Sequence, residues 1–191
     1  MNYYIADTHF GHDNIIRLNN RPFRSAEEMD EEIIRRWNSV VKPTDNVYIL
    51  GDFCYGRQIP VETYLNRLNG NKYIIIGNHD KASVMRNAQK HCESIIWVRD
   101  YAEITDDCAG DQKIVLCHYP MVEWNGYFRM TIHLYGHIHN NTDNSSYKIM
   151  SKIPNAYNVG VDILDFTPRT LKEVIAYNRS FNQTHSKGEK Q

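Results

Sequence analysis

Five short apolar runs in this chain of 191 residues end directly in side chains that can bind a metal ion. The runs cover residues 3–6, 47–50, 73–76, 114–117 and 132–135. Most of them are continuous rather than alternating, which is typical of strands that are covered on both faces. Two further runs, 94–98 and 157–163, predict two more strands. We therefore expect buried sheets with other elements packed against both faces.

Helical patterns lie between the predicted strands. Ser25 and Glu28 form a capping box, and apolar residues follow it at helical spacing. Residues 61–68, 81–90 and 170–181 predict three further helices. Strands that alternate with helices favour an α/β fold. No long linker divides the chain, so we expect a single domain over residues 1–182 and a polar, frayed tail over residues 183–191.

The residues that follow the five strands can all bind a divalent cation. In chain order they are Asp7 and His9, Asp52, Asn78, His118, and His137 with His139. In α/β sheets such side chains collect at the carboxyl ends of the strands, so we expect them to converge on one edge. Carboxylate, imidazole and amide ligands suit Mn²⁺, Fe²⁺, Zn²⁺ or Co²⁺ better than Ca²⁺. The set is too large for one ion with an open position, but it suffices for two ions that share the Asp52 carboxylate.

Taken singly, each of these residues has an ordinary structural interpretation. A lone His after a strand is usually structural, and we interpret His91, His133 and His185 as structural or solvated. A lone Gly-Asp or Gly-Asn is mostly a turn. The prediction of a metal site depends on the joint occurrence of such groups after five strands of one chain.

These motifs resemble the full motif set of the calcineurin-like metallophosphoesterases. They are Asp7-x-His9, Gly51-Asp52, Gly77-Asn78-His79-Asp80, His118 and Gly136-His137-x-His139, and they occur in the family's order. The resemblance implies a four-layer α-β-β-α sandwich with two facing mixed sheets and a metal site at the carboxyl ends of the strands. The chain looks most like the small bacterial and phage phosphoesterases of this group.

The resemblance also implies a role for each site residue. Asp7, His9, Asp52 and His139 would hold one divalent metal ion, and Asp52, Asn78, His118 and His137 would hold a second. Mn²⁺ is the expected metal, with Fe, Zn, Co and Ni as alternatives. His79 would be the catalytic histidine and Asp80 would orient it. Small bacterial members often show Asn-Pro-Gly-Ser near the end, where this chain has Asn158-Val159-Gly160, so the role of Asn158 stays open.

The expected activity is hydrolysis of a phosphomonoester or phosphodiester by a hydroxide that bridges the two metals. A nuclease or cyclic-nucleotide phosphodiesterase with the same dinuclear site is the main alternative. A non-catalytic scaffold of the same fold should have lost ligands or His79, and here all of them are present. In a metal-storage protein, Asn78 would be a weak ligand and His79 would be superfluous.

Residues that contact the substrate are harder to predict. His12, Asn14, Arg17 and Arg21 follow the first motif and could grip a phosphate. They could equally be ordinary loop and helix-surface residues. Trp124 and Tyr127 lie between two ligand motifs, where they could stack on a ring or cover the sheet edge. We expect Phe128, which follows them, to pack in the core.

Charge and composition restrict the partners. The formal net charge is -1, which disfavours a long nucleic-acid track and favours a small phosphorylated substrate, with nucleotides among the candidates. The four cysteines include no CxxC pair, which disfavours a zinc knuckle. The chain shows no signal peptide and no apolar stretch of about 18 residues, so we expect a cytoplasmic protein that is not in a membrane. The natural substrate and the oligomeric state stay open.

Overall fold

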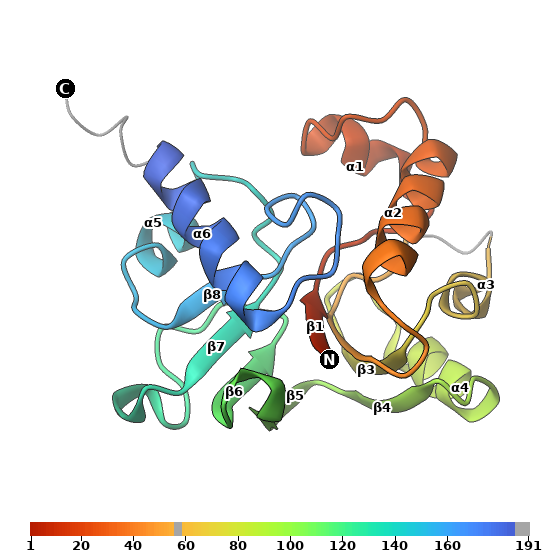
Figure 1. Ribbon diagram of the computed structural model, residues 1–191. Coiled ribbons are helices and arrows are strands. Elements are labelled where there is room, and N and C mark those ends of the chain that lie inside the picture. Colours follow the sequence, from red (N-terminus) through yellow and green to blue (C-terminus); the bar gives the residue numbers. More distant parts are fainter. Residues whose placement is uncertain (56–58, 186–191) are drawn as a thin grey trace.

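The computed structural model describes residues 1–55 and 59–185 and contains two four-stranded sheets that face each other (Figure 1). The first sheet has the strand order β1-β2-β3-β4, with bounds Asn2–Ile5, Asn46–Leu50, Asn71–Ile75 and Ile95–Arg99. The second has the order β5-β6-β7-β8, with bounds Tyr101–Asp106, Gln112–Cys117, Ile132–Tyr135 and Ala156–Asn158. The α/β fold expected from the sequence is confirmed.

The neighbouring strands of the first sheet pair in parallel. Helices α2 (Ala26–Val40), α3 (Val61–Leu65) and α4 (Ala82–His91) cover its outer face, on the right of Figure 1. Apolar residues of the strands and of these helices form one buried cluster, which explains the continuous apolar runs. The Ser25 hydroxyl caps α2 by accepting from the backbone N–H of Glu28 at 3.2 Å.

The second sheet is mixed, because β5 is antiparallel to β6 whereas β6, β7 and β8 are parallel. Trp124 and helix α5 (Ser145–Met150) pack against its outer face in a small apolar cluster with Val115 and Tyr135. Helix α6 (Leu171–His185) packs along β8 and β1. The remaining helical segments are α1 (Asp13–Leu18) and two 3₁₀ turns, Asp107–Ala109 and Tyr127–Arg129.

The core between the sheets holds the inward side chains of both. Leu50 and Ile75 from the first sheet share one buried cluster with Leu116 and Leu134 from the second. Because β1, β2 and β3 run parallel in the first sheet and β6 and β7 run parallel in the second, their carboxyl ends lie at common edges. The loops that leave these ends carry the predicted metal ligands.

Several expectations about the elements are wrong. The first sheet is parallel in its named pairs rather than mixed. The predicted strand 157–163 ends at Asn158, because the Asn158 side chain accepts from the backbone N–H of Gly160 at 2.8 Å and turns the chain. Strand β5 was not predicted, since its alternating exposure leaves no continuous apolar run.

The last helix is longer than predicted. Helix α6 reaches His185, so residues 183–185 of the predicted tail are helical, while residues 186–191 lie outside the described residues. Within residues 1–55 and 59–185, no helix is long and apolar enough to cross a membrane.

Candidate metal centre

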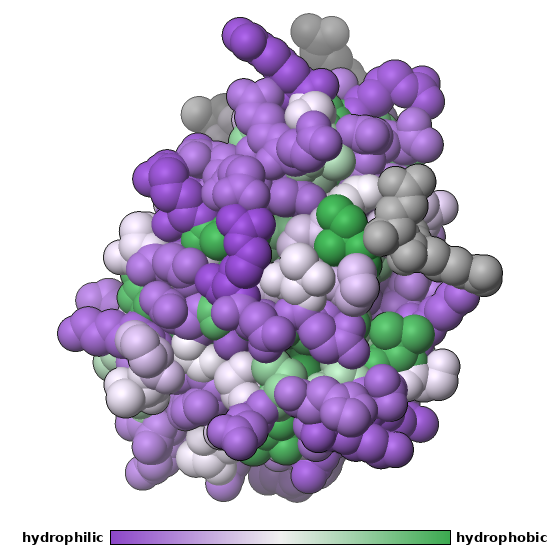
Figure 2. All heavy atoms as spheres, turned by 90° about the vertical axis from the view of Figure 1, so that its right-hand side faces the viewer, coloured by the Kyte–Doolittle hydropathy of each residue, from purple (hydrophilic) through white to green (hydrophobic). Residues whose placement is uncertain are grey.

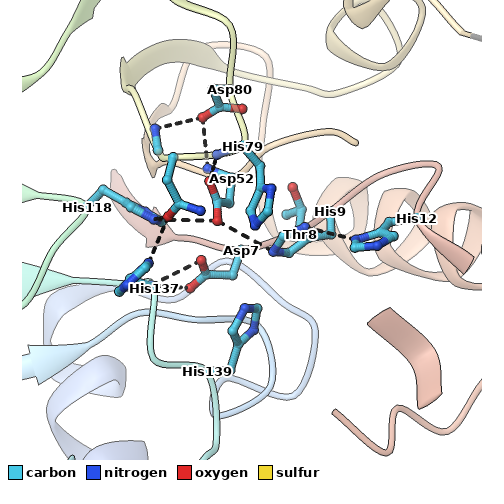
Figure 3. Close-up of polar contacts among 12 residues, drawn as sticks. Asp7, Thr8, His9, His12, Asp52, His79, Asp80, His118, His137 and His139 are labelled. Atoms are coloured by element: carbon cyan, nitrogen blue, oxygen red, sulfur yellow. Dashed lines mark hydrogen bonds and ion pairs between the residues drawn. The ribbon is translucent and has the colours of Figure 1, made fainter. Parts of the chain in front are cut away.

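Two groups of potential metal ligands lie at the ends of the strands (Figure 3). The first consists of Asp7, His9 and His139, and the second of Asp52, His118 and His137. Within each group, the candidate ligand atoms lie within 4.8 Å of one another. The convergence predicted from the sequence is thus found in the structure, and it joins residues from both sheets.

The Asp52 carboxylate lies between the two groups. Its Oδ2 is 3.7 Å from Nε2 of His9 in the first group and 3.5 Å from Nε2 of His118 in the second. Its Oδ1 accepts the backbone N–H of His79 at 2.8 Å. One oxygen is therefore held by the protein while the other faces both groups, which is the arrangement that a bridging carboxylate needs.

Asn78 belongs with the second group. Its side-chain Oδ1 lies 3.0 Å from Nε2 of His118 and 2.8 Å from Nδ1 of His137. The other ring nitrogen of His118 lies 2.8 Å from the carbonyl oxygen of Leu50, a bond in which Nδ1–H donates. Nε2 of the same ring faces Asn78 and Asp52, as it would in a ligand whose second nitrogen is held by the backbone.

The first group contains a buried polar atom without a partner. Nε2 of His9 is the one such side-chain atom among the described residues, and His9 is 1% exposed. An unpaired buried polar atom costs about 1–3 kcal/mol, so it calls for an explanation. A cation bound beside Asp7 and Asp52 would satisfy this nitrogen. The donor set therefore fits a bound divalent metal.

Burial and neighbouring groups set the charge of the site. Burial raises the pKa of Asp7 to about 6. Burial acts in the same direction on Asp52, but the neighbouring His118 overrides it and holds the pKa of Asp52 at about 2. Burial, reinforced by His139, lowers the pKa of His9 to about 2, so its imidazole is neutral. An ionised Asp52 beside a neutral imidazole is a suitable pair of ligands for a cation.

The backbone is strained at most of the proposed ligands. Positive φ angles between 50° and 72° occur at Asp7, His9, Asp52, His137 and His139. Outside glycine this conformation is uncommon and costs of order 1–3 kcal/mol, and it persists where the surroundings enforce it. The Asp52 side chain lies so close to the backbone of Gly77 that a Cβ at this position would be 2.3 Å from Oδ1 of Asp52. Only glycine fits there without displacing the Asp52 carboxylate.

Asp80 does not have the role that was expected for it. Its Oδ2 accepts the backbone N–H groups of Asp52 at 2.8 Å and Gly77 at 2.9 Å, and its Oδ1 accepts that of Phe53 at 3.0 Å. The expectation that Asp80 orients His79 is therefore corrected. Asp80 instead joins the loop that carries the proposed bridge to the loop that carries Asn78.

Arg21 is not available to a substrate, which corrects a second expectation. Its guanidinium is fully buried and pairs with the buried Asp162 at 2.8 Å. It also donates to the backbone carbonyl oxygens of Asp7 at 2.8 Å and Thr8 at 3.0 Å. Arg21 thus supports the strained loop after β1 from within the protein.

Asp162 was not predicted as part of the site. Its Oδ2 lies 2.8 Å from Nδ1 of His139, which leaves Nε2 of that ring facing Asp7 and His9. Burial would raise the pKa of Asp162, but Arg21 and His139 together lower it to about 2. Asn158 supports the same ligand, since its amide donates to the backbone carbonyl of His139 at 2.8 Å.

The other predicted substrate residues lie on or beside α1. His12 is 8% exposed, and its Nδ1 lies 3.3 Å from Nδ1 of His9, so it positions that ligand. Its ring also stacks on Tyr55, with centroids 3.7 Å apart. Asn14 and Arg17 are exposed. Contact of these three residues with a substrate stays a prediction.

The predictions for the aromatic segment between two ligand motifs, which contains Trp124 and Phe128, are also corrected in part. Phe128, which was expected in the core, is 85% exposed. It lies in the 3₁₀ turn Tyr127–Arg129, between Gly126 and Met130, which both have positive φ angles, and this turn directs its side chain outward. Trp124 is buried, and its indole N–H donates to the carbonyl oxygen of Thr131 at 2.9 Å. Trp124 therefore covers the sheet, which was one of the two open alternatives.

Comparison with known proteins agrees with this geometry. Residues 3–118 match the family model of the calcineurin-like phosphoesterases. The chain belongs to this family. The match ends at His118, and the structure extends the same site to His137 and His139. The general activity of this calcineurin-like phosphoesterase is metal-dependent hydrolysis of phosphoesters. The two groups of side chains could hold the divalent metal ions that the family typically binds.

Relatives of this calcineurin-like phosphoesterase occur in archaea, phages and bacteria. An uncharacterized protein of Methanocaldococcus jannaschii is 30% identical over an alignment of 190 positions, and the alignment covers 91% of this chain and 88% of that protein. The Gene 66 protein of Mycobacterium phage L5 is 28% identical over an alignment of 132 positions, and the alignment covers 63% of this chain and 63% of that protein. The crystal structure of a protein of unknown function from Aquifex aeolicus is similar, with a TM-score of 0.69 and 28% identity, covering 92% of this chain and 98% of that one.

Proposed function

We propose that this protein hydrolyses a phosphomonoester or phosphodiester with two divalent cations, most readily Mn²⁺. The observation that carries the proposal is the position of Asp52. Its Oδ2 faces Nε2 of His9 at 3.7 Å and Nε2 of His118 at 3.5 Å, and these nitrogens belong to different ligand groups. A protein with a single metal site has no need for a carboxylate between two complete groups.

The residues of the two groups would divide the ligand positions between them. Asp7, His9, Asp52 and His139 would hold one cation, and Asp52, Asn78, His118 and His137 the other. When bound, such a pair of cations would lower the pKa of a water molecule so that hydroxide is available near neutral pH, and would stabilise negative charge on the phosphoryl oxygens. Mixed oxygen and nitrogen ligands support Mn²⁺, with Fe, Zn, Co and Ni as alternatives.

His79 supplies the remaining function of the site. Its backbone N–H holds Asp52, and its ring centroid lies 5.4 Å from that of His9 (Figure 3). The side chain is exposed rather than buried among the ligands. From this position, His79 donates a hydrogen bond to a phosphoryl oxygen or a proton to the leaving oxygen. General acid catalysis of this kind contributes about 10²–10⁴ in rate.

A substrate screen of the metal-loaded protein tests the proposal. Protein reconstituted with Mn²⁺ is assayed against bis(p-nitrophenyl) phosphate, p-nitrophenyl phosphate, nucleotides and pyrophosphate. We expect turnover of at least one ester in the wild type and its loss in Asp52→Ala. The matched control is Asp111→Asn, because Asp111 is exposed and its φ of 59° suits Asn. Tight metal binding without hydrolysis of any ester would contradict the proposal and support a storage role.

A further inference from the structure

A cavity of about 560 Å³ opens beside His79. Its walls come from the chain after β2, from the start of α3 and from α4. Small-molecule sites in proteins have volumes of about 300–1,000 Å³. The cavity is therefore large enough to hold part of a substrate.

Part of the cavity wall consists of apolar side chains that are left facing solvent. Tyr55 is 44% exposed, Ile59 is 47% exposed and Val84 is 42% exposed, and all three line this one cavity. On this side of the molecule the surface is mostly hydrophilic and its apolar atoms form small separate patches (Figure 2). Exposed apolar side chains that gather in a concave site, rather than scatter singly, are typical of a ligand-binding surface.

The cavity lies next to the metal centre, because a chain of ring contacts links its wall to a proposed ligand. The Tyr55 ring centroid lies 5.4 Å from that of His79, which in turn lies 5.4 Å from that of His9. Tyr55 also stacks on His12, whose Nδ1 lies 3.3 Å from the ligand His9. His79 thus has the proposed metal ligands on one side and the cavity on the other.

We propose that this cavity binds the leaving group of the phosphoester, and that this group carries a flat aromatic ring such as an aryl ring or a nucleoside base. The proposal rests on the proposed function, since phosphorus must lie at the ligand groups for the leaving group to extend past His79. The Asp80 carboxylate is occupied by backbone N–H groups, and the other two charged residues of the lining, Glu62 and Lys81, have opposite charges that favour neither an anion nor a cation. A small polyol would leave Tyr55, Ile59 and Val84 in contact with water.

Three pairs of compounds, whose members differ by one phenyl ring, test the proposal. Ethyl phosphate and 2-phenylethyl phosphate, each also as its methyl diester, are compared as substrates of the Mn²⁺-loaded protein. Ethylphosphonate and 2-phenylethylphosphonate, which are not hydrolysed, are compared by calorimetric binding. We expect both kcat/KM and affinity to favour the phenyl compound by at least about 10-fold. In Val84→Asp and Ile59→Asp, which introduce a carboxylate at exposed positions of the wall, this ratio should fall toward one.

The control is Val122→Asp, at a position that is 61% exposed and outside the cavity lining, and it should keep the wild-type ratio. If the wild type hydrolyses the ethyl and phenylethyl esters with nearly equal kcat/KM, the leaving-group proposal is wrong and the proposed function stays intact. The apolar side chains of the wall would then face another occupant, such as a second copy of the chain. A large binding ratio that Val84→Asp abolishes, without hydrolysis of any ester, would confirm the cavity and overturn the proposed function.

Discussion

Replacing Asp80 with Asn tests whether this carboxylate holds the metal loops together. The wild-type carboxylate accepts three backbone N–H groups, those of Asp52, Phe53 and Gly77, at 2.8–3.0 Å. Asn has the same shape but only one acceptor oxygen. If that oxygen takes the place of Oδ2, the bonds from Asp52 and Gly77 remain, and the N–H of Phe53 faces an amide group that cannot accept it.

The expected loss of stability follows from these three bonds. Burial raises the pKa of Asp80 despite its backbone bonds, so the charge adds no net stability, and the two bonds that Asn keeps should lose little. The unpaired N–H of Phe53 adds at least about 1 kcal/mol. The free energy of unfolding should fall by about 1–3 kcal/mol, which lowers Tm by about 2–12 °C in a chain of this size.

Calorimetry in the presence of a chelator measures this loss without the contribution of bound metal. Asp111→Asn, an exposed and chemically matched change, should stay within about 0.5 kcal/mol of the wild type. Asp80→Asn should also bind less Mn²⁺, because Asp52 and Asn78 lose their common anchor. Unchanged stability and metal content, together with an altered response to the leaving group, would refute this reasoning and show that Asp80 acts on His79.

Three further changes have distinct expected results. Gly77→Ala places a Cβ 2.3 Å from Oδ1 of Asp52, so it should lower the free energy of unfolding by about 1–3 kcal/mol and reduce the metal content. Wild-type values of both, measured by calorimetry and metal analysis, would refute the steric argument. Burial lowers the pKa of Lys72 to about 8, so between pH 7.5 and 9.5 the unfolded chain binds more protons at this residue than the folded chain does. Over this range the free energy of unfolding of the wild type, measured by urea titration, should rise by about 2 kcal/mol relative to Lys72→Met. A difference that does not change with pH would contradict the lowered pKa. The His79→Ala variant should keep its metal ions in elemental analysis, and a loss of metal would show that His79 is a ligand. If His79 is the general acid, the variant should lose more activity on an alkyl phosphate than on a p-nitrophenyl ester.

The metal ligands could be predicted because their positions depend on local order along the chain. Each follows an apolar run directly, and parallel strands bring the ends of such runs together. The roles of Arg21 and Asp162 could not be predicted in this way. Their bond joins residues 141 positions apart, and it depends on how the turn after β8 packs against the segment that follows α1.

Two errors show the same limit at single residues. Asp80 follows His79 in the sequence, but its carboxylate points to the backbone of a loop 27 and 28 residues earlier, which adjacency does not reveal. Phe128 is apolar and lies among aromatic residues, yet the positive φ angles at Gly126 and Met130 direct its turn outward. Apolar character predicts burial only where the local backbone turns the side chain inward.

The central claim of the account is that Asp52 joins two metal ions in one site. Elemental analysis of Mn²⁺-reconstituted and desalted protein tests it most directly, with Asp111→Asn as the matched control. The wild type and the control should each hold about two ions per chain, and Asp52→Ala should hold far less, because both groups lose the oxygen that faces His9 and His118. Wild-type metal content and activity in Asp52→Ala would show that the bridge assigned to this residue is wrong.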